Sequence, residues 1–241
     1  MDRKHVLLTG AAGQVGGILR SDWGGRYRLR LADLKPVEDA TELEEIVRLD
    51  ITELEPFVDA CRGIDTVVHL AADRRPTADF YETLLSLNII GAYNAFEAAR
   101  IAGCRRVVFA SSVNAVLGYA ETGEQCTPDM AVYPINVYGA TKCWGEAVAR
   151  VYAHRHGLSC IAVRLTTPSL APDEEWDPKE WQRRISPRDT ARLFGNCVDA
   201  DESVKFAIVH GASRHPKCWL EMESTREAIG YEPEDGLVLP R

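Results

Sequence analysis

The sequence predicts a protein of the α/β class, built on a doubly wound parallel sheet with a small C-terminal lobe. Short apolar runs alternate along the chain with longer segments of helical period, as parallel strands and their crossover helices do. A glycine-rich turn over residues 9–16 separates the first apolar run from the first helical segment. The length of 241 residues suits one α/β domain with a small appended lobe.

The strands are expected where apolar runs are short and bounded by turn residues. The first strand is expected over 5–9, and the second over 27–33, where arginines break the alternation of apolar and polar residues. Residues 65–70 read DTVVHL, which is typical of a buried strand. In a doubly wound parallel sheet, ligands lie beyond the carboxyl ends of the strands. The remaining strands are expected over 45–49, 106–110, 159–164 and 206–209.

The helices are expected between these runs. The longest covers 80–102, with apolar residues along one side. Ser186 and Pro187 have the character of an N-cap and a first helical residue, which predicts a helix over 187–199. Gly230 is expected to end the last helix. The other helices are expected over 14–23, 52–61, 138–156 and 221–229.

Composition and charge exclude several classes of function. The formal net charge is −8 and no run of Lys or Arg is long enough to follow a phosphate backbone, so no nucleic-acid partner is expected. No apolar stretch approaches the ~20 residues that span a bilayer, so no membrane association is expected. Seven cysteines are scattered singly without a CxxC pair, and no secretory signal precedes the first apolar run. We therefore expect free thiols, no metal site and a cytoplasmic protein.

The glycine-rich turn has the features of a phosphate-binding loop. It reads TGAAGQVG, follows a strand and opens a helix, which distinguishes such a loop from a mere connector. Gly10, Gly13 and Gly16 allow a tight turn and a close approach of the backbone to a pyrophosphate. The helix that starts at Gln14 and Val15 then presents its first N–H groups to the phosphates. The sequence therefore predicts a Rossmann fold that binds a dinucleotide.

Two carboxylates at strand ends are candidates for the adenosine half of the dinucleotide. Asp33 ends the second strand, near the ~20-residue offset of a ribose-binding acid. A carboxylate there accepts hydrogen bonds from the ribose hydroxyls and repels a 2′-phosphate, which favours NAD over NADP. Asp50 ends the third strand and is a candidate acceptor for the adenine amine. The alternatives are a turn-capping role for Asp33 and a helix-capping role for Asp50.

Tyr138 and Lys142 are the candidate catalytic pair. They are four residues apart at the start of a predicted helix, so they lie on one face, one turn apart. A free phenol has a pKa of about 10 and is a poor base at neutral pH. A nearby ammonium and a positively charged nicotinamide favour the phenolate, which makes Tyr138 a candidate base. The YxxxK spacing alone is common, and the prediction depends on its combination with the glycine loop.

Ser111 and Ser112 follow the fifth strand, at the sheet edge where a substrate would lie. A hydroxyl there can bind the reacting oxygen and stabilise its developing charge. The alternative is that both are turn residues that satisfy local backbone groups.

Taken together, these motifs resemble the extended short-chain dehydrogenase/reductase family, which includes NAD-dependent epimerases and dehydratases. YGATKCWGE and SPRD at 186–189 are most similar to its small uronate dehydrogenase branch, with the NAD-dependent glucose-6-phosphate dehydrogenase relatives of that branch. The likeness runs from residue 5 to about 165 and rests on TGAAGQVG, Asp33, HLAA at 69–72, NIIGAYN at 88–94, FASS at 109–112 and YGATK at 138–142.

The resemblance implies roles for individual residues. The family's catalytic serine falls on Ser112, its base on Tyr138 and its lysine, which also holds the nicotinamide ribose, on Lys142. The carboxylate-binding arginine of the uronate dehydrogenase branch falls on Arg183 or Arg184. The cofactor contacts that the resemblance implies, besides Tyr138 and Lys142, are Gly10, Gly13, Gln14, Val15, Gly16, Asp33, Asp50, Ile51, Leu70, Ala71 and Ala72.

The chain departs from that branch where the sugar would be held. Uronate dehydrogenases typically follow the serine with Asn-His, whereas this chain has Val113 and Asn114, so the sugar itself is left open. The candidate substrate contacts are Ser111, Ser112, Asn114, Arg183 and Arg184. Five arginines on or near the expected site loops are candidate anion ligands or, alternatively, solvated surface residues: Arg74, Arg75, Arg183, Arg184 and Arg188.

The leading hypothesis is oxidation of a hydroxyl of a small sugar, sugar acid or sugar phosphate, with Tyr138 removing the proton and NAD taking the hydride. Residues 1–165 would form the NAD-binding core with the catalytic residues, and residues 166–241 a small, partly irregular substrate lobe packed on the same domain. The alternatives are an epimerase or dehydratase that keeps NAD bound, and a non-catalytic dinucleotide-sensing protein. The resemblance also implies a homodimer through the helices near 80–102 and 138–156.

Overall fold

A seven-stranded parallel sheet is the centre of the computed structural model, which describes residues 3–38, 40–42, 44–169 and 181–236. The strand order is β3-β2-β1-β4-β5-β6-β9, and it reverses between β1 and β4, where a doubly wound sheet binds its ligand. The predicted fold class is confirmed. The strands are β1 (His5–Thr9), β2 (Arg28–Asp33), β3 (Glu44–Arg48), β4 (Thr66–His69), β5 (Arg106–Ser112), β6 (Ser159–Leu165) and β9 (Phe206–Gly211).

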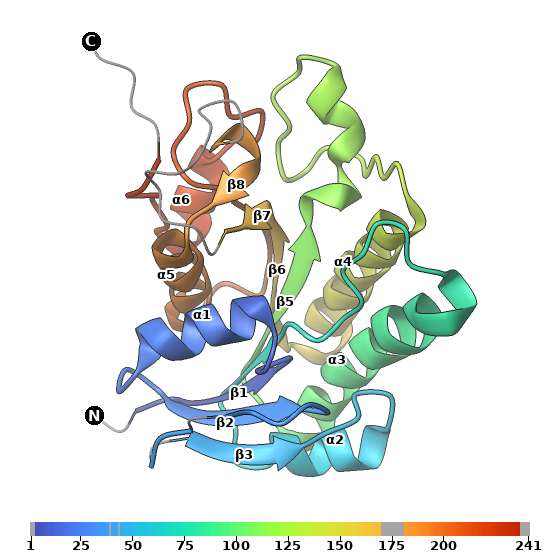
Figure 1. Ribbon diagram of the computed structural model, residues 1–241, viewed down its shortest axis with the longest axis vertical. Coiled ribbons are helices and arrows are strands. Elements are labelled where there is room, and N and C mark those ends of the chain that lie inside the picture. The colour runs from blue at the N-terminus through green and yellow to red at the C-terminus, as the bar shows by residue number, and fades with distance from the viewer. Residues whose placement is uncertain (1–2, 39, 43, 170–180, 237–241) are drawn as a thin grey trace.

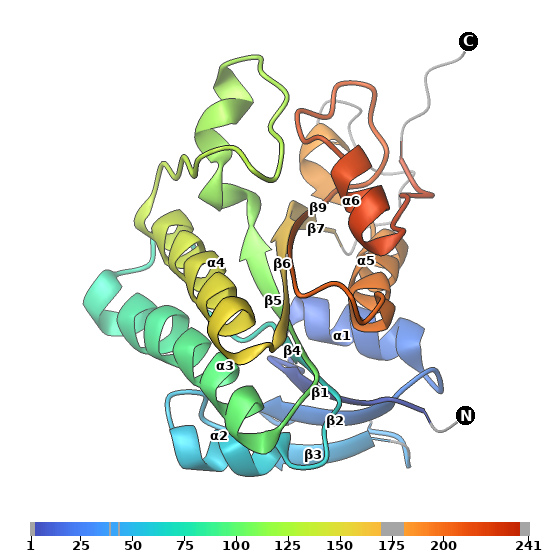
Figure 2. The same ribbon diagram turned by 180° about the vertical axis from the view of Figure 1, so that it is seen from behind.

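Helices cover both faces of this sheet. On one face α1 packs against α5, and α6 lies beside α5 (Figure 1). On the other face α2 packs against α3, and α3 against α4 (Figure 2). The bounds are α1 (Gln14–Trp23), α2 (Leu54–Cys61), α3 (Gly91–Ala102), α4 (Val137–His156), α5 (Pro187–Asp199) and α6 (Glu223–Ile229).

Two hydrophobic cores follow from the alternation of side chains along the strands. Val6 and Leu8 of β1 belong to the core under α1 and α5, whereas Leu7 belongs to the core under α2, α3 and α4. In β5, Val108 faces the first core and Val107 the second. The central strands are thus buried on both sides, which is why they appear in the sequence as continuous apolar runs.

The segment expected as one long helix over 80–102 is helical throughout, but its first half is a π-helix, which the sequence pattern does not indicate. A π-helix, η1 (Phe80–Ile90), precedes α3. Within it the buried amide of Asn88 bonds both backbone groups of Asp73 and the hydroxyl of Thr141. Apolar periodicity does not distinguish the wider π-turn from an α-turn, and π-turns occur often at functional sites.

The segment after β6 contains more regular structure than the sequence indicates. β7 (Thr167–Pro168) and β8 (Arg184–Ile185) form a two-stranded sheet, and η5 (Trp181–Arg183) precedes β8. Ser186 caps α5 as expected, since its hydroxyl accepts from the Asp189 N–H. The strand β9 belongs to the main sheet, and residues of α5 belong to its first core. The division of the chain into two parts at residue 165 stays a prediction.

Two further expectations concern the whole chain. All seven cysteines are free thiols. None of the helices in the described ranges is long and apolar enough to cross a membrane.

Candidate active site

The glycine loop between β1 and α1 has no room for side chains at two positions. Gly10 has φ +72°, and a Cβ there would lie 2.8 Å from the backbone nitrogen of Ala71. A Cβ on Gly16 would lie 2.5 Å from the carbonyl oxygen of Gly10. Gly13 begins α1 without a side-chain cap, so the first N–H groups of α1 are left for another acceptor. This geometry fits a pyrophosphate at the helix N-terminus.

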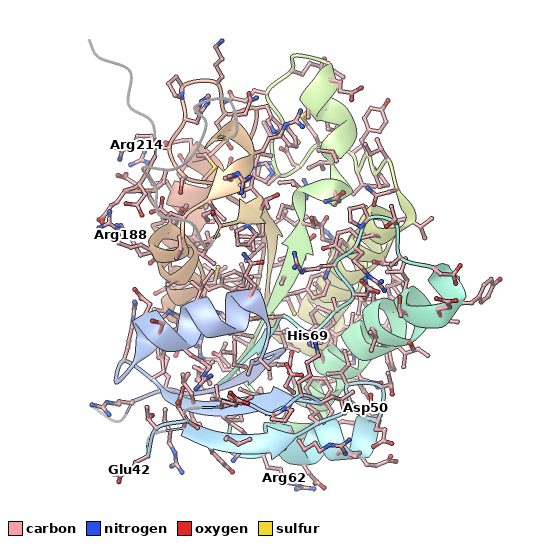
Figure 3. All side chains as sticks on the ribbon, in the orientation of Figure 1. Glu42, Asp50, Arg62, His69, Arg188 and Arg214 are labelled. Atoms are coloured by element: carbon pink, nitrogen blue, oxygen red, sulfur yellow. The ribbon has the colours of Figure 1, made fainter. Side chains whose placement is uncertain are left out.

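Asp33 is tied to this loop. One carboxylate oxygen accepts from the Ala12 N–H at 3.0 Å and the other from the Lys35 N–H at 2.9 Å. Each oxygen keeps a further lone pair for a ribose hydroxyl. Asp50, which precedes α2 (Figure 3), accepts with one oxygen from the N–H and the hydroxyl of Thr52. That contact lies in the turn before α2 and does not cap the helix, because the N-cap of α2 is Glu53 and no side chain caps it.

A polar pair below the loop fixes the end of β4. The Thr9 hydroxyl accepts from the N–H groups of Leu70 and Ala71, and lies 2.9 Å from Nδ1 of His69. His69 is enclosed in the interior (Figure 3), where burial and the charge of Lys142 lower its pKa to about 3. The imidazole is therefore neutral and holds the backbone that lines the switch point. The carboxyl ends of β1 to β4 thus carry the predicted cofactor contacts Gly10, Asp33, Asp50, Ile51, Leu70, Ala71 and Ala72.

Lys142 and Tyr138 are both buried on the first turns of α4. The Lys142 ammonium donates to the carbonyl of Ala110 at 2.8 Å and lies 5.6 Å from the centre of the Tyr138 ring. Burial lowers the pKa of Lys142 to about 8, against the opposing charge of Glu146. The structure therefore brings the two residues together as the four-residue spacing predicts.

The Tyr138 phenol experiences opposing effects. Burial raises its pKa, while the hydrogen bond with Ser112 and the positive charge of Arg74 lower it, and Asp73 raises it. Ser112 is thus within hydrogen-bonding reach of the phenol. A positively charged group bound in the same space would favour the phenolate further.

A chain of side-chain amides holds the Ser112 hydroxyl. Its oxygen accepts from Asn114 Nδ2 at 3.1 Å, and Asn114 Oδ1 accepts from Asn136 Nδ2 at 2.8 Å. Asn136 in turn caps α4, because its Oδ1 accepts from the Gly139 N–H at 2.7 Å. Because Ser112 accepts from Asn114, its own proton is free to point toward Tyr138 or a substrate. Asn114, predicted as a substrate contact, uses both ends of its amide inside the protein.

Ser111 points away from Ser112. Its hydroxyl donates to Glu146 at 2.6 Å, and Glu146 forms two hydrogen bonds of 2.9 Å each with Arg164. Arg164 and Glu146 are both almost fully buried, at 1% and 4% exposure. Removal of either partner of such a buried ion pair strongly destabilises a protein, because the other charge is left buried without a partner. The Ser111 hydroxyl is therefore used inside the protein, and the proposal below assigns it no contact with the substrate.

The five candidate arginines differ from one another in their partners and in their exposure to solvent. Arg75 pairs with Asp73, and Arg188, on the α5 side of the molecule (Figure 3), pairs with Asp235. Arg184 lies in β8 and is half-buried. Arg183 is exposed and lines a cavity at the carboxyl end of the sheet, while Arg74 is exposed beside Tyr138.

Three residues that support the site were not predicted as site residues. Asn136 directly precedes the predicted helix, and the N-cap preference of asparagine could have identified it. Asn88 is a buried amide within a long apolar segment, and Glu146 lies one turn after Lys142. Nothing in the local pattern links Glu146 to Arg164, because the two residues meet only in the folded sheet.

A dinucleotide loop that faces a buried serine, tyrosine and lysine defines an oxidoreductase site of the short-chain dehydrogenase/reductase type. Residues 6–188 match the NAD dependent epimerase/dehydratase family. The chain belongs to this family, and NAD is its cofactor, as the sequence predicts.

Individual relatives cover nearly the whole chain. The chain is 33% identical over 95% of its length to NAD-dependent glucose-6-phosphate dehydrogenase of Haloferax volcanii, of which 93% is covered. It is 34% identical to uronate dehydrogenase of Agrobacterium fabrum, over 96% of this chain and 85% of that protein. A crystal structure of uronate dehydrogenase from Agrobacterium tumefaciens matches with a TM-score of 0.87 and 33% identity, over 98% of this chain and 86% of that one. A mutant of that enzyme complexed with NAD matches with a TM-score of 0.86 and 33% identity, over 96% of this chain and 85% of that one.

Proposed function

We propose that this protein is an NAD-dependent dehydrogenase that oxidises a hydroxyl of a small sugar, sugar acid or sugar phosphate. The observation that carries the proposal is the meeting of Ser112, Tyr138 and Lys142 beside the glycine loop and Asp33. The names of the relatives support the substrate class, because they act on glucose 6-phosphate, uronate and, in a further relative, L-arabinose.

The protein's own residues divide the work. NAD, when bound, supplies the hydride acceptor. The Tyr138 phenolate removes the hydroxyl proton, and the Lys142 ammonium favours that phenolate by its charge. The Ser112 hydroxyl, whose oxygen already accepts from Asn114, donates to the reacting oxygen and orients it. Asp33 and the first turn of α1 would hold the ribose and the pyrophosphate.

A spectrophotometric screen for NADH tests this function. Purified protein is mixed with NAD and with aldoses, uronates or hexose phosphates, and sustained NADH production by one of these classes is expected. An enzyme that retains bound NAD and releases no NADH, yet converts the sugar to an epimer or a dehydrated product, would be an epimerase or dehydratase instead.

The variant Tyr138→Phe tests the assigned base. Turnover is expected to fall by about 10²–10⁴-fold, because the proton acceptor is lost while the ring is kept. The Kd for NAD, measured by fluorescence titration, is expected to stay within about twofold, since the phenol oxygen is not among the groups that hold the pyrophosphate. Undiminished turnover would remove Tyr138 from the mechanism.

We further propose that the protein works as a homodimer in the cytoplasm. Seven free thiols support a reducing compartment. Exposed apolar side chains on η1, α3 and α4, among them Ile90, Tyr93, Ile101 and Val151, support an interface over these neighbouring helices.

A further inference from the structure

A cavity of about 320 Å³ lies between the loop that follows β5 and two segments of the C-terminal part of the chain. One side is formed by residues after η3 (Leu117–Glu121), and the other by η5 and by residues 217–219. Its lining includes two cations, Arg183 and Lys217, and the indole of Trp219. None of the predicted catalytic residues lines it, so it is an additional feature of this end of the sheet.

The two sides of the cavity are fastened together. The Cys126 N–H donates to the carbonyl of Trp219 at 2.7 Å, and the Glu221 N–H donates to the carbonyl of Cys126 at 2.8 Å. A small hydrophobic cluster beneath them includes Trp219 and also Val113, the residue directly after Ser112. The segment after η3 and residues 217–221 are therefore hydrogen-bonded to each other, and the cluster beneath them reaches the residue next to Ser112.

Both cations are available to a ligand. Within the described ranges, neither Arg183 nor Lys217 has an ion pair or a side-chain hydrogen bond. Three of the four other candidate arginines differ, since Arg75 and Arg188 are paired with carboxylates and Arg184 has a partner. An unpaired guanidinium and an unpaired ammonium on two neighbouring segments of one side leave a local positive charge that suits an anion.

The other lining groups fit the part of a sugar that lies next to its anionic group. Glu124 lines the cavity without pairing with either cation, and the amides of Gln125 and Gln182 lie beside it. These side chains can accept from and donate to hydroxyl groups. The half-buried Trp219 offers an apolar surface with a polar edge, as amphipathic ligands require.

Resting on the function proposed above, we propose that this cavity is an anion subsite that takes the phosphate of a phosphorylated sugar, held by Arg183 and Lys217 together. A carboxylate carries one charge and is satisfied by a single bidentate arginine. A phosphate monoester carries about −1.5 to −2 charges and three acceptor oxygens, and therefore uses a second cation from a different segment. The substrate class is thus a sugar phosphate rather than a sugar acid.

Steady-state kinetics with glucose 6-phosphate, glucose and glucuronate as probes test the subsite. Lys217→Ala is expected to raise the KM for glucose 6-phosphate by roughly tenfold or more, because a charge-assisted hydrogen bond is lost. The KM for glucose should stay within about twofold, since no charge is involved. Lys217→Glu should have the larger effect. Lys205→Ala is the matched control, because Lys205 is an exposed lysine beside the amino end of β9.

Two results would overturn the subsite: an unchanged KM for glucose 6-phosphate in both Lys217 variants, or an equal loss with glucose. Calorimetric titration of glucose 6-phosphate in the presence of NADH separates this inference from the proposed function. Binding that weakens in Lys217→Ala supports the subsite even if no sugar is oxidised, in which case the proposed function fails. Oxidation of glucuronate without any binding of glucose 6-phosphate keeps the function and removes the phosphate subsite.

Discussion

At the scale of single residues, the direction of the hydrogen bonds around Ser112 decides what its hydroxyl can do. Asn136 donates to Asn114, and Asn114 donates to Ser112, so the polarity of the chain runs toward the serine oxygen. The serine proton is left to point outward, where an oxygen that gains negative charge needs a donor. Asn114 therefore positions Ser112, although it does not itself reach the substrate with its amide.

Reversing that polarity is expected to impair turnover. In Asn114→Asp the side chain keeps its shape but can only accept, so it competes with the substrate for the Ser112 proton. We expect kcat to fall by roughly 10–100-fold with the Kd for NAD unchanged, measured by steady-state kinetics and NAD titration. In a Ser112→Ala background the same change should have no further effect on kcat, and an additive loss there would contradict the positioning role.

The charge of Arg74 is expected to set the pH at which the enzyme becomes active. Arg74 lowers the pKa of Tyr138 against the effect of burial, which raises it. Removing that charge in Arg74→Gln raises the pKa of the phenol, so the rising limb of the kcat profile should move to higher pH, by up to about one unit. Arg74→Lys keeps the charge and serves as the control. An identical limb in Arg74→Gln and the parent enzyme would show that the limb does not report on Tyr138.

At the scale of elements, two adjacent glycines at the start of α1 differ in the space that the fold leaves around them. A Cβ on Gly16 would lie 2.5 Å from the carbonyl oxygen of Gly10 and 2.6 Å from that of Ala11, whereas a Cβ on Gly17 would meet nothing within 4 Å. The first glycine is therefore required by the close packing of the phosphate loop, and the second is not.

This difference gives a matched pair of variants. Gly17→Ala is expected to stabilise the protein by about 0.5–1 kcal/mol, because alanine loses less entropy in a helix, and to leave NAD binding unchanged. Gly16→Ala is expected to destabilise it by about 1–3 kcal/mol and to weaken NAD binding, since the backbone of the loop must move. Urea denaturation and NAD titration measure both effects. Equal behaviour of the two variants would show that the loop accommodates a side chain at either place.

The elements also show where the sequence is informative. The sequence predicted the bounds of β1 and α1 as the structure has them, and the start of α4 within one residue. Each of these elements has a local signal: an apolar run, a glycine turn, or the spacing of Tyr138 and Lys142. The π-helix around Asn88 was missed, since its wider turn is fixed by contacts with Asp73 and Thr141 from other segments. Ser111 and Ser112 look equivalent in sequence, and only the pairing of Glu146 with Arg164 on the neighbouring elements separates their roles.

At the scale of the whole molecule, one face of the sheet leaves its outer helices incompletely covered. α3 and α4 lie side by side over the second core (Figure 2), and their contact includes the rings of Tyr93 and Tyr152, 6.3 Å apart. Tyr93 is nevertheless 43% exposed and Val151 53% exposed. A second copy of the chain that packs on these helices would cover both side chains, and a stable interface of this kind buries about 800 Å² per partner.

A charge placed on this face is expected to separate the two copies. Val151→Glu introduces a carboxylate that would be buried without a partner in the dimer and solvated in the monomer, so sedimentation equilibrium should show a monomer where the parent protein shows a dimer. Ile46→Glu is the control, because Ile46 is 51% exposed on the edge strand β3, away from α4, and the same charge there should leave the dimer intact. Since the site residues of α4 lie on its buried face, the monomer should still bind NAD. A parent protein that sediments as a monomer, or a Val151→Glu variant that remains dimeric, would place the interface elsewhere or remove it.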